Sequence, residues 1–140
     1  MHLTIINGPN LNLLGKREPE IYGSKSFEDF LEELKQRFTS VEFDYFQSNH
    51  EGALIDKMQD CNGKTDGIIF NGAGLTHYSI ALADTIAAIA TPVIEVHISN
   101  IHAREEYRHK SFTAAKAVGA ITGLGLEGYA LAVRYFLEKK

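Results

Sequence analysis

The chain has 140 residues, of which 44% are hydrophobic and 23% charged, and its formal net charge is -4. This is the balance of a globular protein with one core. Nucleic-acid and anionic-membrane surfaces need clustered basic residues, so the mildly acidic composition favours neither partner. No apolar run approaches the ~20 residues of a membrane span. The single cysteine, Cys61, cannot form an intrachain disulfide, and we expect a cytoplasmic protein with this thiol buried.

Short apolar runs alternate with helical patterns along the chain. In chain order, the periodicity predicts a strand over 3–6, a helix over 27–38, a strand over 41–46, a helix around 54–61, a strand over 67–70, a helix over 76–90, a strand over 93–97, a helix over 104–116, a strand over 117–121 and a helix over 125–139. Ser26 and Thr76 are the predicted N-caps. Strands that are apolar on both faces and alternate with helices are typical of a parallel sheet covered on both sides. We therefore predict a flavodoxin-like, three-layer α/β domain with a five-stranded parallel sheet, spanning 1–140.

The connection after the first strand is unusually long. It runs for about 20 residues, over 7–25, whereas connections in α/β units usually have about 2–6, and long ones are commonly lids. Within a lid at about 15–25, Arg17 lies close to Tyr22. A guanidinium lowers the pKa of a nearby phenol from about 10 and favours a tyrosine base. An ordinary surface loop explains the same pattern equally well at this point.

Polar residues also follow other predicted strands, and ligands bind at the carboxyl ends of such strands. Asn71 follows the third strand, while Glu95 and His97 share one face of the fourth. A carboxylate beside a histidine orients it and raises its pKa, which suits a general acid. A lone histidine is more often a core residue, but polar clusters at several strand ends favour one shared crevice.

Two further patterns are weaker. The set His102, Glu105, Glu106 and His109 does not match the spacing of known metal motifs, so we predict a solvated helix face and no metal. Residues 123–128 fit G-x-G-x-x-G, but a dinucleotide site needs a further strand with an acidic residue. We therefore interpret these glycines as a tight turn with close helix–sheet packing, and expect no cofactor.

Residues 7–15, 17–19 and 22–23, together with 95–105 and 123–129, resemble the signatures of the type II 3-dehydroquinate dehydratases. The similarity covers essentially the whole chain in order. It implies a cofactor-free and metal-free lyase that converts 3-dehydroquinate to 3-dehydroshikimate by anti elimination through an enolate. The setting would be the shikimate pathway of aromatic amino acid biosynthesis or quinate breakdown. The resemblance also implies a homo-oligomer, a dodecamer of flavodoxin-like subunits.

The resemblance implies residue roles by motif position. Tyr22 would be the base, and Arg17 would hold its pKa down. Asn10 would help to stabilise the enolate. His97 would protonate the departing hydroxyl, with Glu95 orienting it. The residues that would bind substrate are Asn71, His77, Ile98, Ser99 and Arg108, with Asp84 contributed by a neighbouring subunit.

The loop after the third strand departs from the family pattern. Members often carry proline or alanine where this chain has Gly72, and threonine where it has Tyr78. Gly72 and Gly74 are expected to loosen the loop. The change is expected to affect substrate affinity or subunit contacts and not the reaction.

Non-catalytic flavodoxin-like modules are the main alternatives. A phosphotransfer receiver needs acidic residues where this chain has Asn7, Asn10 and Asn71. A flavin carrier usually has a Ser/Thr-rich phosphate loop after the first strand, whereas this loop carries Pro9 and several leucines. A degenerate homologue kept as a scaffold need not retain the whole implied catalytic set.

Overall fold

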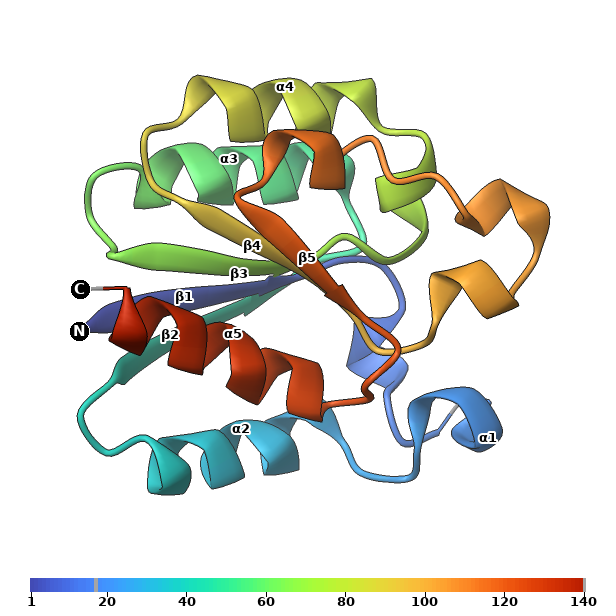
Figure 1. Cartoon of the computed structure of the whole chain (residues 1–140), viewed down its shortest axis with the longest axis horizontal. Coiled ribbons are helices and arrows are strands. Elements are labelled where there is room, and N and C mark those ends of the chain that lie inside the picture. The colour runs from blue at the N-terminus through green and yellow to red at the C-terminus, as the bar shows by residue number, and fades with distance from the viewer. Residues whose placement is uncertain (17, 140) are drawn as a thin grey trace.

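The computed structural model (Figure 1) describes residues 1–16 and 18–139, and of Tyr22 only the backbone. Five parallel strands form one sheet in the order β2-β1-β3-β4-β5. Their bounds are β1 His2–Asn7, β2 Glu42–Gln47, β3 Gly67–Asn71, β4 Val93–His97 and β5 Gly119–Thr122. The predicted α/β fold with a five-stranded parallel sheet is confirmed.

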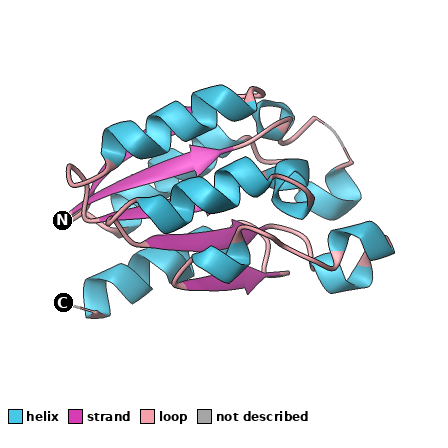
Figure 2. Ribbon diagram, turned by 90° about the horizontal axis from the view of Figure 1, so that it is seen from above, coloured by secondary structure: helices cyan, strands magenta, loops and turns pink. Residues whose placement is uncertain are grey.

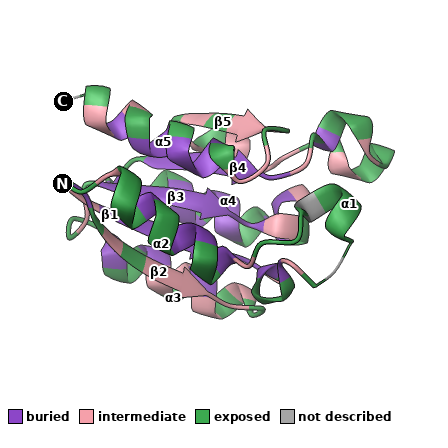
Figure 3. Cartoon of the chain, turned by 90° about the horizontal axis from the view of Figure 1, so that it is seen from below, coloured by how far each residue is buried: buried purple, intermediate pink, exposed green. Residues whose placement is uncertain are grey.

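Helices cover both faces of the sheet (Figures 1 and 2). The helices α2 (Phe27–Arg37) and α5 (Glu127–Glu138) pack on one face, and α3 (Glu51–Cys61) and α4 (Ile80–Ala88) pack on the other. Alternation along the strands divides the core accordingly: Leu3 and Ile5 join the α2–α5 cluster, and Ile6 joins the α3–α4 cluster. The central strands β1, β3 and β4 are the most buried part of the molecule (Figure 3).

The predicted start of α2 and the buried cysteine are confirmed. The Ser26 hydroxyl accepts a hydrogen bond from the Asp29 amide at 3.2 Å, which satisfies one of the unpaired amides of the first turn. Cys61 is buried at the end of α3.

The predicted start of the next helix is wrong. Residues Ala73–His77 form a 3-10 turn, η2, and α4 begins only at Ile80. Ser79 is the N-cap, because its hydroxyl accepts from the Leu82 amide at 3.0 Å. The hydroxyl of Thr76 is buried and has no hydrogen-bond partner among the described residues.

The predicted helix over 104–116 is also wrong. The segment contains two short 3-10 turns, η4 (Glu106–Arg108) and η5 (Ala114–Lys116), and residues 109–113 between them form no helix. Tertiary bonds compete with helix formation there. The Phe112 amide donates to the Thr76 carbonyl at 3.0 Å, and the side chains on either side of Phe112 bond to β4.

The interpretation of 123–128 as a structural turn is confirmed. Gly123 and Gly125 have φ angles of +88° and +61°, in the left-handed region that favours glycine. A Cβ on Gly128 would lie 3.1 Å from the Val96 side chain, so its absence lets α5 pack closely on the sheet.

Candidate active site

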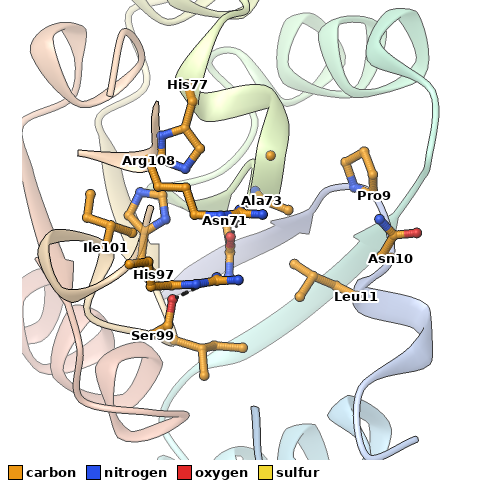
Figure 4. Close-up of a pocket in the computed structure, with 13 residues that line it drawn as sticks. Pro9, Asn10, Leu11, Asn71, Ala73, His77, His97, Ser99, Ile101 and Arg108 are labelled. Atoms are coloured by element: carbon orange, nitrogen blue, oxygen red, sulfur yellow. Dashed lines mark hydrogen bonds between the residues drawn. The ribbon is translucent and has the colours of Figure 1, made fainter. Parts of the chain in front are cut away.

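A pocket opens at the carboxyl end of the sheet, beside the point where the strand order reverses between β1 and β3 (Figure 4). This is where open α/β sheets bind ligands. Its walls are formed by Pro9, Asn10, Leu11, Asn71, Ala73, Gly74, His77, His97, Ile98, Ser99, Ile101, Arg104 and Arg108. His77, His97 and Arg108 gather on one side, opposite Pro9 and Asn10.

The pocket brings together residues from separate strand ends, as the sequence predicts. Among the expected site residues, those that line it are Asn10, Asn71, His77, His97, Ile98, Ser99 and Arg108. Glu95 lies behind His97 and is fully buried, and Asp84 is exposed on α4 away from the pocket walls. Arg17 and the side chain of Tyr22 lie outside the described residues. The backbone of Tyr22 ends the short helix α1 (Pro19–Tyr22) within the connection after β1.

A buried acid–base pair lies at the end of β4. His97 Nε2 lies 2.7 Å from Glu95 Oε2, and the two residues are 5% and 0% exposed. Burial alone would raise the pKa of Glu95, but hydrogen bonds from His97, Ser111 and Thr113 hold it below its usual range. Glu95 is therefore an anion near neutral pH, and it orients the imidazole at the pocket wall.

A second histidine faces the first. The rings of His77 and His97 are stacked with centroids 6.0 Å apart. His77 Nδ1 donates to the Lys110 carbonyl at 2.8 Å, which fixes its tautomer when the ring is neutral. Burial lowers the pKa of His77, so this ring is neutral near pH 7. It can offer Nε2 to a ligand as an acceptor.

Two arginines give the pocket its positive charge. Arg108 Nε donates to Glu105 Oε2 at 2.7 Å, and Arg104 Nη1 donates to the Ser99 hydroxyl at 3.2 Å. Arg104 Nη2 also lies 4.0 Å from Glu18 Oε2, just before α1. The arrangement suits an anionic ligand. Sequence reasoning missed Arg104, because it placed the residue on a helix that does not form.

The loop that carries Asn10 is held by the loop after β2. Asn10 has a φ angle of 71°, and its amide donates to Asn49 Oδ1 at 2.9 Å. Gln47 Nε2 donates to the Gly8 carbonyl at 3.1 Å and to Asn49 Oδ1 at 3.2 Å. Sequence reasoning did not single out Gln47 or Asn49. The signal was the polar run that directly follows the strand.

Replacing Asn49 with alanine should weaken the site by removing the acceptor for the Asn10 amide. One lost hydrogen bond of this kind corresponds to a fall in catalytic efficiency of about tenfold. Asn49→Asp is the matched control, because it keeps the acceptor oxygen and should retain most activity. Steady-state kinetics of the two variants make the comparison, and equal kinetics would remove Asn49 as a support of Asn10.

A buried polar chain, formed by the hydrogen-bonded side chains of Asn71, Tyr129 and Asn7, orients Asn71. The Tyr129 hydroxyl donates to Asn7 Oδ1 at 2.8 Å and accepts from Asn71 Nδ2 at 3.0 Å. Asn71 Oδ1 accepts from the Ala73 amide at 3.0 Å, so the orientation of its amide is fixed. Burial raises the pKa of Tyr129 far above its usual value, and the phenol remains protonated. The second Nδ2 hydrogen of Asn71 can serve a ligand.

Replacing Tyr129 with phenylalanine should lower the free energy of unfolding by about 1–3 kcal/mol, because two buried amides lose their partner. Tyr107→Phe is the control, since Tyr107 is 69% exposed and its change should stay within about 0.5 kcal/mol. Urea denaturation measures both. A Tyr129→Phe midpoint equal to that of Tyr107→Phe would show that the buried hydrogen bonds of Tyr129 add no stability.

The departures at 72–78 have a structural explanation. A Cβ on Gly72 would lie 2.7 Å from both the Phe70 ring and the Thr76 hydroxyl, so this packing needs glycine. Tyr78 is 67% exposed, so its size causes no crowding within the subunit. Gly72 is buried in this close contact, and the expectation that it loosens the loop stays a prediction.

Among residues 1–16 and 18–139, no group of three or more histidine, cysteine or acidic side chains is arranged to hold a metal ion. In the described part of the chain, no helix combines the length and apolarity needed to cross a bilayer.

The fold and the pocket define an α/β protein with a site at the carboxyl end of its sheet, where a buried Glu95–His97 pair and two arginines suit a small anionic ligand. The model of the family "Dehydroquinase class II" matches residues 1–137. The chain therefore belongs to the class II dehydroquinase family.

Known proteins are similar to this chain over nearly its full length. A 3-dehydroquinate dehydratase of Halothermothrix orenii is 57% identical, over 94% of this chain and 90% of that protein. One of Bacillus licheniformis is 54% identical, over 98% and 96%. The crystal structure of the type II dehydroquinase from Butyrivibrio crossotus superimposes with a TM-score of 0.93 at 46% identity, covering 98% of this chain and 97% of that one.

Proposed function

We propose that this protein removes water from 3-dehydroquinate by anti elimination through an enolate, with Tyr22 as the base and His97 as the general acid. The family match over residues 1–137, with relatives named 3-dehydroquinate dehydratase, supports the overall reaction. The observation that carries the mechanism is the buried Glu95–His97 pair at the wall of a pocket with two arginines.

The chemistry needs three groups. A base removes the proton next to the ketone, a donor stabilises the enolate oxygen, and an acid protonates the hydroxyl that leaves from the β position. Tyr22, on the proposed lid at 15–25, is the base, and Arg17 favours its phenolate form. Asn10 supplies a neutral amide for the enolate. His97 delivers its proton to the leaving oxygen while Glu95 holds the ring.

The pocket offers matching contacts to an anionic polyol. The positive charge of Arg108 suits the substrate carboxylate, and Asn71 and His77 offer polar atoms to its hydroxyls. Ile98 and Ser99 bind substrate at the end of β4. We also propose that Arg104 strengthens the positive field of the pocket.

We further propose that the catalytic unit is an oligomer, a dodecamer, in which Asp84 reaches the site of a neighbouring subunit. Asp84 is exposed on α4, and Ile80, its first residue, and Tyr78, two residues earlier, are exposed large hydrophobic side chains. Such residues favour burial against another copy.

The assay of the purified protein with 3-dehydroquinate tests the proposal. The product is a conjugated enone, so ultraviolet absorbance should rise with time. Activity should survive a chelator, and it should survive borohydride in the presence of substrate, because the mechanism uses neither a metal nor a Schiff base. Absence of turnover would overturn the proposed reaction, and loss of activity with chelator would overturn its metal-free mechanism.

A further inference from the structure

The segment 110–113, which connects η4 to η5, bonds to His77 and to the carboxylate that orients His97. Its Lys110 carbonyl accepts from His77 Nδ1 at 2.8 Å. Its Phe112 amide donates to the Thr76 carbonyl at 3.0 Å, which ties the segment to η2. The side chains on either side of Phe112, those of Ser111 and Thr113, bond to the carboxylate of Glu95 behind His97.

The carboxylate of Glu95 accepts three hydrogen bonds. Ser111 Oγ lies 2.6 Å and His97 Nε2 lies 2.7 Å from its Oε2, and the Thr113 hydroxyl donates to its Oε1. Glu95 and Thr113 are fully buried. Only an ionised carboxylate accepts from three donors without supplying a hydrogen itself. His97 therefore carries a hydrogen on Nε2, and Nδ1 is the nitrogen left to exchange a proton with a ligand.

The local backbone makes this arrangement possible. Ser111 lies just before a tight turn, and Thr113 lies within that turn with φ -75° and ψ -35°. The turn brings both hydroxyls to the two oxygens of one carboxylate. The Ser111 hydroxyl also accepts from the Ala114 amide at 2.9 Å, which closes the turn that leads into η5.

We propose that Ser111 and Thr113 are positioning residues for the general acid: they hold Glu95 in one orientation, and Glu95 fixes the ring of His97. The consequence for turnover rests on the proposed function. Neither hydroxyl lines the pocket, so both act through Glu95.

The positioning role of the two hydroxyls predicts a change in the pH at which the Glu95–His97 pair loses its proton. Hydroxyl donors stabilise the pair after it has lost its proton, because the pair is then an anion. Removing a donor therefore raises the pH at which the pair deprotonates, and it also weakens the pair as an acid. Among the described residues, the charged and titratable groups that face the pair across the pocket are His77, Arg104 and Arg108. The pKa of His77 is lowered by burial, so this ring titrates on the acid side and leaves the basic limb to the pair.

Thr113→Val tests the proposal, because valine keeps the shape and removes the donor. We expect kcat to fall by about tenfold, with KM changed by less than about twofold. The basic limb of the pH–rate profile should move to higher pH. Thr113→Ser restores the hydroxyl, so it should restore kcat and return the basic limb of the pH–rate profile to its parental position. Thr85→Val is the matched control, since Thr85 is a buried threonine whose hydroxyl donates to the Ala81 carbonyl within α4.

A second measurement needs no substrate. The imidazole signals of His97, followed by nuclear magnetic resonance, should titrate at higher pH in Thr113→Val and in Ser111→Ala than in the parent protein. Identical titration curves, or an unchanged kcat in folded Thr113→Val, would overturn the proposal. If the parent protein does not turn over 3-dehydroquinate, the proposed function fails, and the titration alone still decides whether the two hydroxyls act on His97.

Discussion

Replacing His97 with glutamine should lower kcat by on the order of 10²–10⁴-fold, the usual contribution of general acid catalysis. The reason is that glutamine keeps the hydrogen bond of the His97 ring to Glu95 but not the ability of that ring to release a proton. Glutamine places an amide nitrogen where His97 Nε2 donates to Glu95, so the buried carboxylate keeps a partner and the fold survives. An amide does not deliver a proton to a leaving hydroxyl near neutral pH. The loss should therefore appear in kcat more than in KM.

Steady-state kinetics and thermal unfolding of His97→Gln make the test together. His2→Gln is the control, because His2 pairs with Asp44 on the surface at the amino end of β1, far from the pocket. It should keep its activity, since exposed ion pairs add little. A folded His97→Gln enzyme with near-parental kcat would exclude His97 as the acid.

Tyr22→Phe should reduce turnover by a similar factor, on the order of 10²–10⁴-fold, while the protein still folds and binds substrate. Phenylalanine keeps the ring and removes only the oxygen that would take the proton next to the ketone. Because that step forms the enolate, no later step compensates for its loss. Binding is expected to persist, since the pocket contacts come from the ends of β1, β3 and β4 and the loops after them.

Calorimetry with 3-dehydroquinate separates binding from turnover in Tyr22→Phe. Heat of binding with little product formation is the expected result. Tyr107→Phe serves as the control for a tyrosine on the exposed surface of η4. Turnover within a few-fold of the parent would mean that another group is the base.

The sheet could be predicted from the sequence because its signals are local. The run 67–70 is apolar throughout and 93–96 is apolar except for Glu95, and the Ser26 cap is close in sequence to the helix it starts. The polar clusters at the ends of β3 and β4 could be found for the same reason. Glu95 and His97 are two residues apart on one strand, so alternation alone places them together.

The failures come from contacts between distant residues. The stretch 109–113 has no local reason to avoid a helix. It forms no helix, and its groups bond elsewhere: Phe112 bonds to Thr76, and Ser111 and Thr113 bond to Glu95. The same holds for Asn49, whose partner Asn10 lies 39 residues away.

The buried polar chain also limits how the sequence can change over time. In the chain Asn71–Tyr129–Asn7 each hydrogen bond runs in one direction, so every member needs the chemistry of its neighbour. A single substitution leaves a buried group unsatisfied, whereas an apolar set that replaces all three removes the requirement. Positions 7, 71 and 129 thus form one evolutionary unit. We expect them to vary together or stay fixed, although Asn7 and Tyr129 are 122 residues apart in the sequence and Asn71 is 58 residues from Tyr129.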